Sequence, residues 1–193
     1  MKILLAITGA SGSIYGLRLL EELLRAGHQV SLVASQSGQE VCRYETGVDL
    51  GDSEALKLLW NLPDAPVTIR NATDLWAPEA SGSAAPDAMV IAPCSMGTVG
   101  RIAAGISGNL IERAADVMLK EHRPLLLLPR ETPFSTIHLE NLLKLSQCGV
   151  RIIPAMPAFY QKPESLDDLV NFVVGKLLDQ LGIEHSLFKR WGT

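Results

Sequence analysis

Short apolar runs that alternate with helical stretches constrain the fold of this chain most strongly. Four such runs, each followed by a turn of small, proline or glycine residues, span 3–7, 88–92, 125–128 and 150–153. An unbroken apolar run of this length fits a strand that is covered on both faces, because a strand with one wet face alternates apolar and polar residues. The sequence therefore predicts an α/β fold, a doubly wound parallel sheet with helices on both faces.

The positions of prolines, glycines and apolar residues give the bounds of the expected strands and helices. Proline cannot donate a hydrogen bond to a sheet, so we expect it to mark the point where a strand stops. We predict strands at 2–7, 29–34, 67–69, 88–92, 124–128 and 150–153, and helices at 12–26, 36–45, 53–60, 109–121, 135–147 and 166–181. A broken helix follows Gly97, a loop covers 77–87, and Ser165 caps the last helix with Asp168 in its first turn.

Length and composition narrow the class of protein. The 193 residues are most simply one domain, 1–193, with a sizeable core. A net charge of −4 with scattered Lys and Arg gives no electrostatic case for a nucleic-acid partner, and no apolar run is long enough for a membrane span. Met1 and Lys2 lead straight into a strand, so we expect no signal peptide and a cytoplasmic location.

The cysteines agree with that location. Cys42, Cys94 and Cys148 are odd in number and far apart in the sequence. We expect free thiols in a reducing compartment, because a disulfide framework or a zinc site would need closer or paired spacing.

The first candidate for a functional site is the end of the four-leucine strand. Pro129 is followed at once by Arg130 and Glu131. Charge at the end of a buried strand is costly unless it is paired or used, and open α/β sheets bind ligands at the carboxyl ends of their strands. Solvated charges in an ordinary loop are the alternative. The recurrence of the same layout after the other strands favours a shared crevice.

A glycine-rich turn after the first strand is the second candidate. Gly9, Ala10, Ser11 and Gly12 lead into a helix, whose free N–H groups and positive dipole end suit a phosphate. Through Gly16 the spacing is G-x-x-G-x-x-x-G, which departs from the dinucleotide fingerprint G-x-G-x-x-G. A mononucleotide or a simple phosphate is therefore favoured over NAD, and a plain strand-to-helix turn is the alternative.

Two further segments carry polar groups of interest. The run 94–98, Cys-Ser-Met-Gly-Thr, repeats the layout of a strand end, hydroxyls, a glycine and a helix start, and two such loops could hold the two ends of one cofactor. Its Cys94 more often packs than reacts. Arg113 and Lys120 lie seven residues apart on one helix face, for which a solvated surface paired with Glu112 and Asp116 is the better interpretation from spacing alone.

Some patterns are missing from the sequence. It has no H-x-H, H-E-x-x-H or C-x-x-C metal pattern and no D-D-x-x-D cluster that would hold magnesium and a diphosphate. Phosphate chemistry in this chain would therefore rest on Arg, Lys and backbone amides.

Several segments together resemble one family over essentially the whole chain. The matching segments are Thr8–Gly12 with Tyr15 and Gly16, Ala80–Ser83, Pro93–Ser95, Asn109–Asp116, Pro129–Pro133, Ile137–Leu142 and Arg190–Gly192. They are similar to the UbiX family of flavin prenyltransferases, and the stretch 109–145 is the most specific part.

The resemblance implies a flavodoxin-like sheet in a large homo-oligomer, usually a dodecamer. It implies binding of FMN and dimethylallyl monophosphate, and transfer of the prenyl group to N5 and C6 of reduced FMN without a metal. The product, prenylated FMN, would serve a UbiD-type decarboxylase, as in ubiquinone biosynthesis.

The resemblance also implies roles for individual residues. FMN would contact Gly9, Ala10, Ser11, Ser35, Ser95, Met96, Gly97, Thr98 and Arg130. The prenyl phosphate would meet Lys120, Arg130, Tyr160 and Lys176. Glu131 would be the acid or base, Ser11 and Glu45 a supporting polar pair, and Arg113 and Trp191 would lie at subunit contacts that border the site.

Two other functions stay open at this point. An FMN-dependent cysteine decarboxylase of the same superfamily would place a catalytic histidine in the first-helix region, where this chain has none before His28. A non-catalytic FMN carrier would leave Lys120, Arg130, Glu131 and Tyr160 without a purpose.

Overall fold

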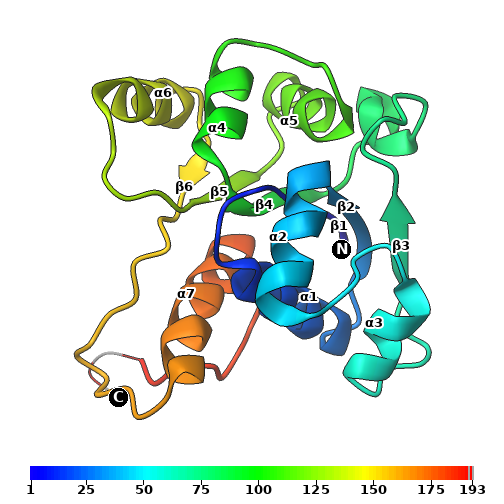
Figure 1. Cartoon of the computed structure of the whole chain (residues 1–193). Helices are drawn as coiled ribbons and strands as arrows, with labels where there is room; N and C mark the ends of the chain where they lie inside the picture. The colour runs from blue at the N-terminus through cyan, green and yellow to red at the C-terminus, as the bar shows by residue number, and fades with distance from the viewer. Residues whose placement is uncertain (191, 193) are drawn as a thin grey trace.

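A single six-stranded parallel sheet organises the chain in the computed structural model, which describes residues 1–190 and 192 (Figure 1). The strand order is β3-β2-β1-β4-β5-β6, and every neighbouring pair is parallel. The strands are β1 (Lys2–Ile7), β2 (Gln29–Ala34), β3 (Val67–Arg70), β4 (Ala88–Cys94), β5 (Leu125–Pro129) and β6 (Arg151–Ile152). The predicted doubly wound, flavodoxin-like α/β fold is confirmed.

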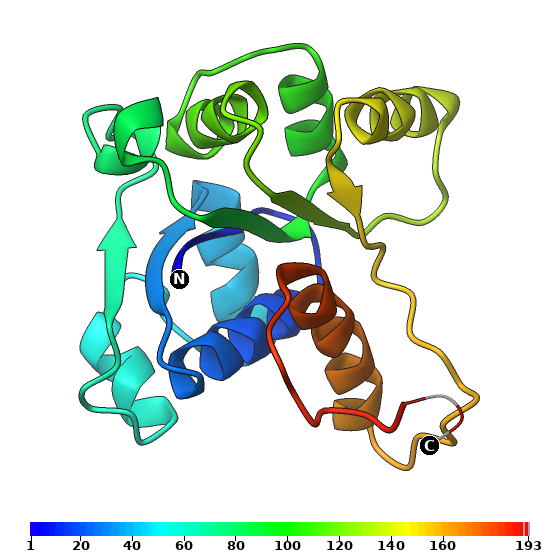
Figure 2. The same cartoon turned by 180° about the vertical axis from the view of Figure 1, so that it is seen from behind.

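Helices cover both faces of this sheet (Figures 1 and 2). They are α1 (Ser13–Arg25), α2 (Gln36–Thr46), α3 (Ser53–Leu59), α4 (Met96–Ala103), α5 (Leu110–Lys120), α6 (Thr136–Gln147) and α7 (Leu166–Leu181). One face carries α1 and α7, and the other carries α4, α5 and α6. None of the helices described is long and apolar enough to cross a membrane.

The unbroken apolar runs follow from this double cover. In β5, Leu126 and Leu128 enter the core under α1 and α7, whereas Leu125 and Leu127 enter the core under α4 and α5. Each of these four leucines is at most 1% exposed. At about 1.5–3 kcal/mol for each fully buried leucine, this pattern strongly disfavours a register that exposes either face of the strand.

Most predicted elements match the structure within one or two residues, and three details differ. β4 continues one residue past Pro93 to Cys94, whereas β5 ends at Pro129 as expected, and the carbonyl oxygens of the two prolines accept hydrogen bonds from the amides of Thr8 and Ala155. The predicted loop 77–87 contains two short 3₁₀ helices, η1 (Pro78–Ala80) and η2 (Gly82–Ala84). The predicted strand 150–153 is shorter in the structure, where β6 comprises only Arg151–Ile152.

Candidate active site

The chain reverses its direction across the sheet between β1 and β4, and Thr8 joins the two strands there. The Thr8 hydroxyl donates to the Pro93 carbonyl at 3.0 Å and accepts from the Ser95 amide at 2.8 Å. In open α/β sheets this switch point is where ligands bind. Thr8 is 1% exposed, so it fixes the two loops that follow β1 and β4 against each other.

The glycine turn after β1 is held by Glu45 from the end of α2. The Glu45 carboxylate accepts from the Gly12 amide at 3.0 Å and from the Ser13 amide at 2.9 Å. The free N–H groups that the sequence suggested at this helix end are thus paired with a protein carboxylate, which corrects the prediction of a phosphate held by these amides. Gly12 has φ 107°, a left-handed conformation that favours glycine.

Burial opposes the ionised form of Glu45, but hydrogen bonds from Ser11, Gly12 and Ser13 outweigh it and hold the Glu45 pKa below its ordinary value. The predicted polar pair of Ser11 and Glu45 therefore exists in the structure. A carboxylate with a lowered folded pKa contributes stability above its unfolded pKa, about 4.3 for Glu, and this contribution is lost as pH falls through the folded pKa.

Replacing Glu45 with Gln should therefore lower the free energy of unfolding by about 0.5 kcal/mol at pH 7, because charge-assisted hydrogen bonds to two amides are weakened and solvent screens this exposed carboxylate. Urea titration of both proteins at several pH values measures the difference, which should shrink as the pH drops below about 4. Glu40→Gln on the exposed side of the same helix is the control and should change little. A constant difference down to pH 2 would contradict the role given to the Glu45 charge.

Hydroxyl groups gather where α2 begins, opposite the glycine turn. Ser35 caps α2 by accepting from the Gly38 amide at 3.0 Å, and its hydroxyl lies 3.2 Å from that of Ser37. A Cβ on Gly9 would come within 2.4 Å of the Ser37 hydroxyl oxygen. Only glycine therefore allows the β1 turn to approach α2 so closely. Sequence reasoning passed over Ser37 and gave Thr8 no role, although Ser-x-Ser at a helix start is a visible signal.

The third loop, after β4, repeats this arrangement. Ser95 caps α4 by accepting from the Thr98 amide, and the two hydroxyl oxygens are 3.0 Å apart. Met96 and Thr98 are buried, while a Cβ on Gly97 would meet only the Arg101 guanidinium at 3.5 Å. The Cys94 side chain beneath this loop points into the core, and burial raises its pKa to about 12. The prediction that Cys94 packs instead of reacting agrees with this placement.

Arg130, at the end of β5, reaches the glycine turn across the switch point. Its Nε donates to the Ser11 carbonyl oxygen at 3.0 Å, although 119 residues separate them. Among the residues that the structure describes, no acceptor pairs with the two terminal nitrogens of this guanidinium. Glu131 follows, and its carboxylate accepts from the Thr132 amide at 3.0 Å. Arg130 at the β5 end therefore meets the Gly9–Gly12 corner, as the sequence predicted, whereas the Glu131 carboxylate contacts the backbone of its own loop.

Tyr160 and Lys176 form a second group beside α7. The Tyr160 and Phe172 rings stack edge to face at 5.9 Å, and the Lys176 Nζ lies 5.6 Å from the centre of the same Phe172 ring. The loop that carries Tyr160 leaves the sheet beside the end of β5, because the Ala155 amide donates to the Pro129 carbonyl at 3.2 Å. This loop and the C-terminal segment then run to the same end of α7 (Figure 1).

Lys120 and Arg113 lie elsewhere in this subunit. Lys120 ends α5, pairs with Glu121, and would be 2.9 Å from a Cβ on Gly82, near the amino ends of the strands. Arg113 donates to the Ala80 carbonyl and pairs with Asp116 at 2.8 Å, the partner expected from helix spacing. The other expected partner, Glu112, pairs with Arg101 instead. One chain alone does not place Lys120 in the crevice, and Trp191 lies outside the described residues.

The crevice fits a flavin mononucleotide in its chemistry. Three loops present serine and threonine hydroxyls and the Arg130 guanidinium, whose two terminal nitrogens have no acceptor among the described residues, and such groups suit a phosphate and polar ring edges. Within residues 1–190 and 192, no three His, Cys, Asp or Glu side chains gather into a metal site.

Residues 1–178 match the family described as Flavoprotein. The flavin prenyltransferase UbiX of Halalkalibacterium halodurans is 54% identical over 187 residues, which cover 96% of this chain and 91% of that relative. The chain belongs to the UbiX family of flavin prenyltransferases.

Solved structures of UbiX-like proteins have the same fold. A dodecameric FMN-dependent UbiX-like decarboxylase from Escherichia coli O157:H7 is 42% identical with a TM-score of 0.90 over the whole of both chains. AnUbiX (PadA1), in complex with FMN and dimethylallyl pyrophosphate, is 39% identical with a TM-score of 0.90 and covers 100% of this chain and 97% of its own. The UbiX resemblance read from the sequence is confirmed.

Proposed function

We propose that this chain joins the dimethylallyl group of dimethylallyl monophosphate to N5 and C6 of reduced FMN, with prenylated FMN as product. The observation that carries the proposal is the contact between Arg130 and the Ser11 carbonyl, which holds a guanidinium by its Nε at the switch point between β1 and β4. When bound, reduced FMN would supply the nucleophilic atoms and an aromatic face. The relatives and the complex with FMN and dimethylallyl pyrophosphate support this assignment.

Different residues would bind FMN, bind the prenyl donor and move the proton. Gly9, Ala10 and the hydroxyls of Ser11, Ser35, Ser95 and Thr98 would bind FMN, with Met96 and Gly97 shaping the β4 loop. Arg130 would bind the leaving phosphate, because a planar fork of donors stabilises the charge that develops on it. Glu131 would move a proton, either to the departing phosphate or from flavin C6. Tyr160 and Lys176 would hold the donor from the α7 side.

The position of Lys120 supports an oligomer. Lys120 lies near the amino ends of the strands, so it would serve as a catalytic cation only in the crevice of a neighbouring copy. We place Arg113 at the same contact. A homododecamer is the assembly we propose, because the E. coli UbiX-like decarboxylase is described as dodecameric.

We further propose that the product serves a UbiD-type decarboxylase, in ubiquinone biosynthesis or a related pathway, in the cytoplasm. The free thiols of Cys42, Cys94 and Cys148 support a reducing compartment.

One assay tests the reaction. The protein is incubated anaerobically with reduced FMN and dimethylallyl monophosphate, and the mass of the released flavin is recorded. A gain of one C5 unit is expected with the monophosphate, and parallel reactions with the diphosphate rank the two donors. Tight FMN binding with unchanged flavin mass would instead identify a carrier, and decarboxylation of a cysteine-ending peptide would identify a cysteine decarboxylase.

A further inference from the structure

The C-terminal segment 183–190 is fastened to α7 by a single carboxylate. Asp179 accepts from His185 Nε2 at 3.1 Å, and its two oxygens lie 2.8 and 2.7 Å from the two terminal nitrogens of Arg190. Lys176 Nζ is 3.7 Å from the same carboxylate. Asp179 therefore gathers three basic side chains, two of them from the segment and one from the helix.

A missing side chain on α7 makes room for this segment. Gly175 lies inside the helix, where glycine is normally unfavourable by about 1 kcal/mol. A Cβ at this position would come within 2.4 Å of the Phe188 ring and 2.7 Å of the His185 ring. These two rings pack with their centres 5.1 Å apart, directly over the bare backbone. Gly175 therefore leaves open the space that these two rings of the segment occupy.

The docked segment determines the surroundings of Lys176. Its ammonium lies 5.0 Å from the centre of the Phe188 ring and 5.6 Å from that of Phe172, distances at which a cation is attracted to an aromatic ring. Phe188 comes from the segment and Phe172 from α7. Without the segment, Lys176 would lose the Phe188 ring and would keep only Phe172 and Asp179, its contacts within α7.

The same segment also lines a cavity to which Tyr160 contributes. This cavity of about 590 Å³ is lined by Tyr160, Phe172, Phe188 and Arg190, among others from the 158–163 loop, α7 and the segment. The Gln161 amide group donates to the Lys189 carbonyl at 2.7 Å and so joins loop and segment. Figure 2 shows the segment running along α7 to meet this loop.

We propose that Asp179 and Gly175 are positioning residues for the prenyl donor, because they dock segment 183–190 so that Tyr160 lines one preformed cavity and Lys176 is held against two rings of its wall, Phe172 and Phe188. This inference rests on the proposed function. Neither residue needs to touch the donor: Asp179 acts through Arg190 and His185, and Gly175 acts by leaving space for two rings. The lowered pKa of Asp179, where hydrogen bonds from Arg190 and His185 outweigh burial, agrees with a carboxylate that stays charged in this cluster.

Two variants test the docking by independent routes. Asp179→Asn removes the charge that holds Arg190. Gly175→Ala places a methyl group where the Phe188 and His185 rings pack, although alanine favours the helix itself. Asp179→Glu keeps the charge, and Glu184→Gln removes an exposed carboxylate from the same segment as the matched control. Hydrogen–deuterium exchange of the C-terminal peptide reports docking directly, and the Leu187 amide, which donates to His185, is one of its sensitive groups.

Asp179→Asn and Gly175→Ala should each speed exchange in the C-terminal peptide and raise the KM for dimethylallyl monophosphate about tenfold. FMN affinity and kcat at saturating donor should change less than twofold. Asp179→Glu should recover most of the donor affinity, and Glu184→Gln should behave as the wild type.

Faster exchange with an unchanged KM would overturn the proposal, as would unchanged exchange. If the wild-type protein binds FMN but transfers no prenyl group, the proposed function fails instead. Faster exchange in Asp179→Asn and Gly175→Ala with unchanged FMN affinity would in that case still show that these two residues dock the segment.

Discussion

Replacing Glu131 with Gln is expected to slow prenyl transfer by about 10²–10⁴-fold, the usual contribution of a positioned acid or base. Gln has the same shape and keeps an oxygen that can accept from the Thr132 amide at 3.0 Å, so the loop after β5 should hold its form. What the variant loses is the carboxylate that would take up or release the proton in the transfer. Single-turnover formation of prenylated FMN, followed by flavin mass, measures the rate.

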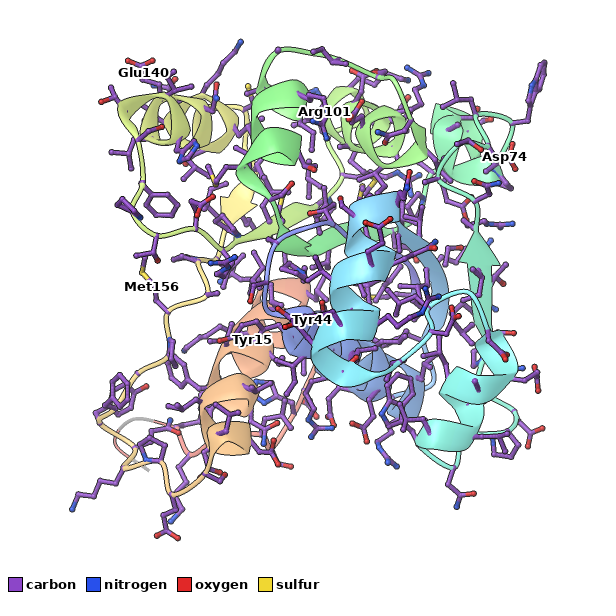
Figure 3. All side chains as sticks on the ribbon, viewed as in Figure 1. Tyr15, Tyr44, Asp74, Arg101, Glu140 and Met156 are labelled. Carbon is purple, nitrogen blue, oxygen red and sulfur yellow. The ribbon has the colours of Figure 1, made fainter. Side chains whose placement is uncertain are left out.

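The Glu131 variant separates chemistry from binding. FMN affinity, measured by quenching of flavin fluorescence, should stay within about twofold of the wild type, because the hydroxyls and Arg130 that we assign to FMN are unchanged. Glu140→Gln on the exposed face of α6 is the control and should transfer at the wild-type rate (Figure 3). Full activity in Glu131→Gln would refute the acid or base role and leave Arg130 as the main source of catalysis.

The strands and their covering helices could be predicted from local pattern because burial on two faces leaves a direct mark on the sequence. The four leucines of β5 divide between two cores, so a strand covered on both faces buries all of them. Element ends were less predictable, since Pro93 and Pro129 remain in the sheet by accepting hydrogen bonds with their carbonyl groups.

The site could be predicted only in part, because its decisive contacts join distant segments. The sequence placed Ser11 at a turn and Arg130 at a strand end, but not the pairing of Glu45 with the amides of Gly12 and Ser13, 32 or more residues away. Spacing suggested that Glu112 pairs along its own helix, whereas it pairs with Arg101 from α4. Local periodicity describes one element at a time and carries no information on which elements meet.

The pair of Arg101 and Glu112 leads to the largest expected effect on stability. Glu112 has a side chain only 2% exposed, and it accepts from Arg101 and from the Gly108 amide at 2.9 Å. Figure 3 shows Arg101 on α4. Arg101→Met would leave this carboxylate buried without its cation. Because Arg101 itself is 47% exposed, we expect a loss of about 2–3 kcal/mol, below the 3–5 kcal/mol typical of fully buried pairs.

That loss corresponds to a fall in Tm of roughly 4–12 °C for a chain of this size, measurable by calorimetry. Arg25→Met, which breaks an exposed pair with Glu21, is the control and should cost about 0.5 kcal/mol or less.

The pH dependence identifies the cause of the expected loss. In the wild type, hydrogen bonds from Arg101 and Gly108 outweigh burial and keep the Glu112 pKa low. In Arg101→Met, burial dominates and raises the folded pKa above the unfolded value, so the folded variant takes up a proton as pH falls and regains stability. The gap to the wild type should therefore narrow from pH 7 to pH 5, and the double variant Arg101→Met with Glu112→Gln should recover part of it at pH 7. A gap that stays constant with pH would trace the loss to packing of the Arg101 stem instead of the stranded charge.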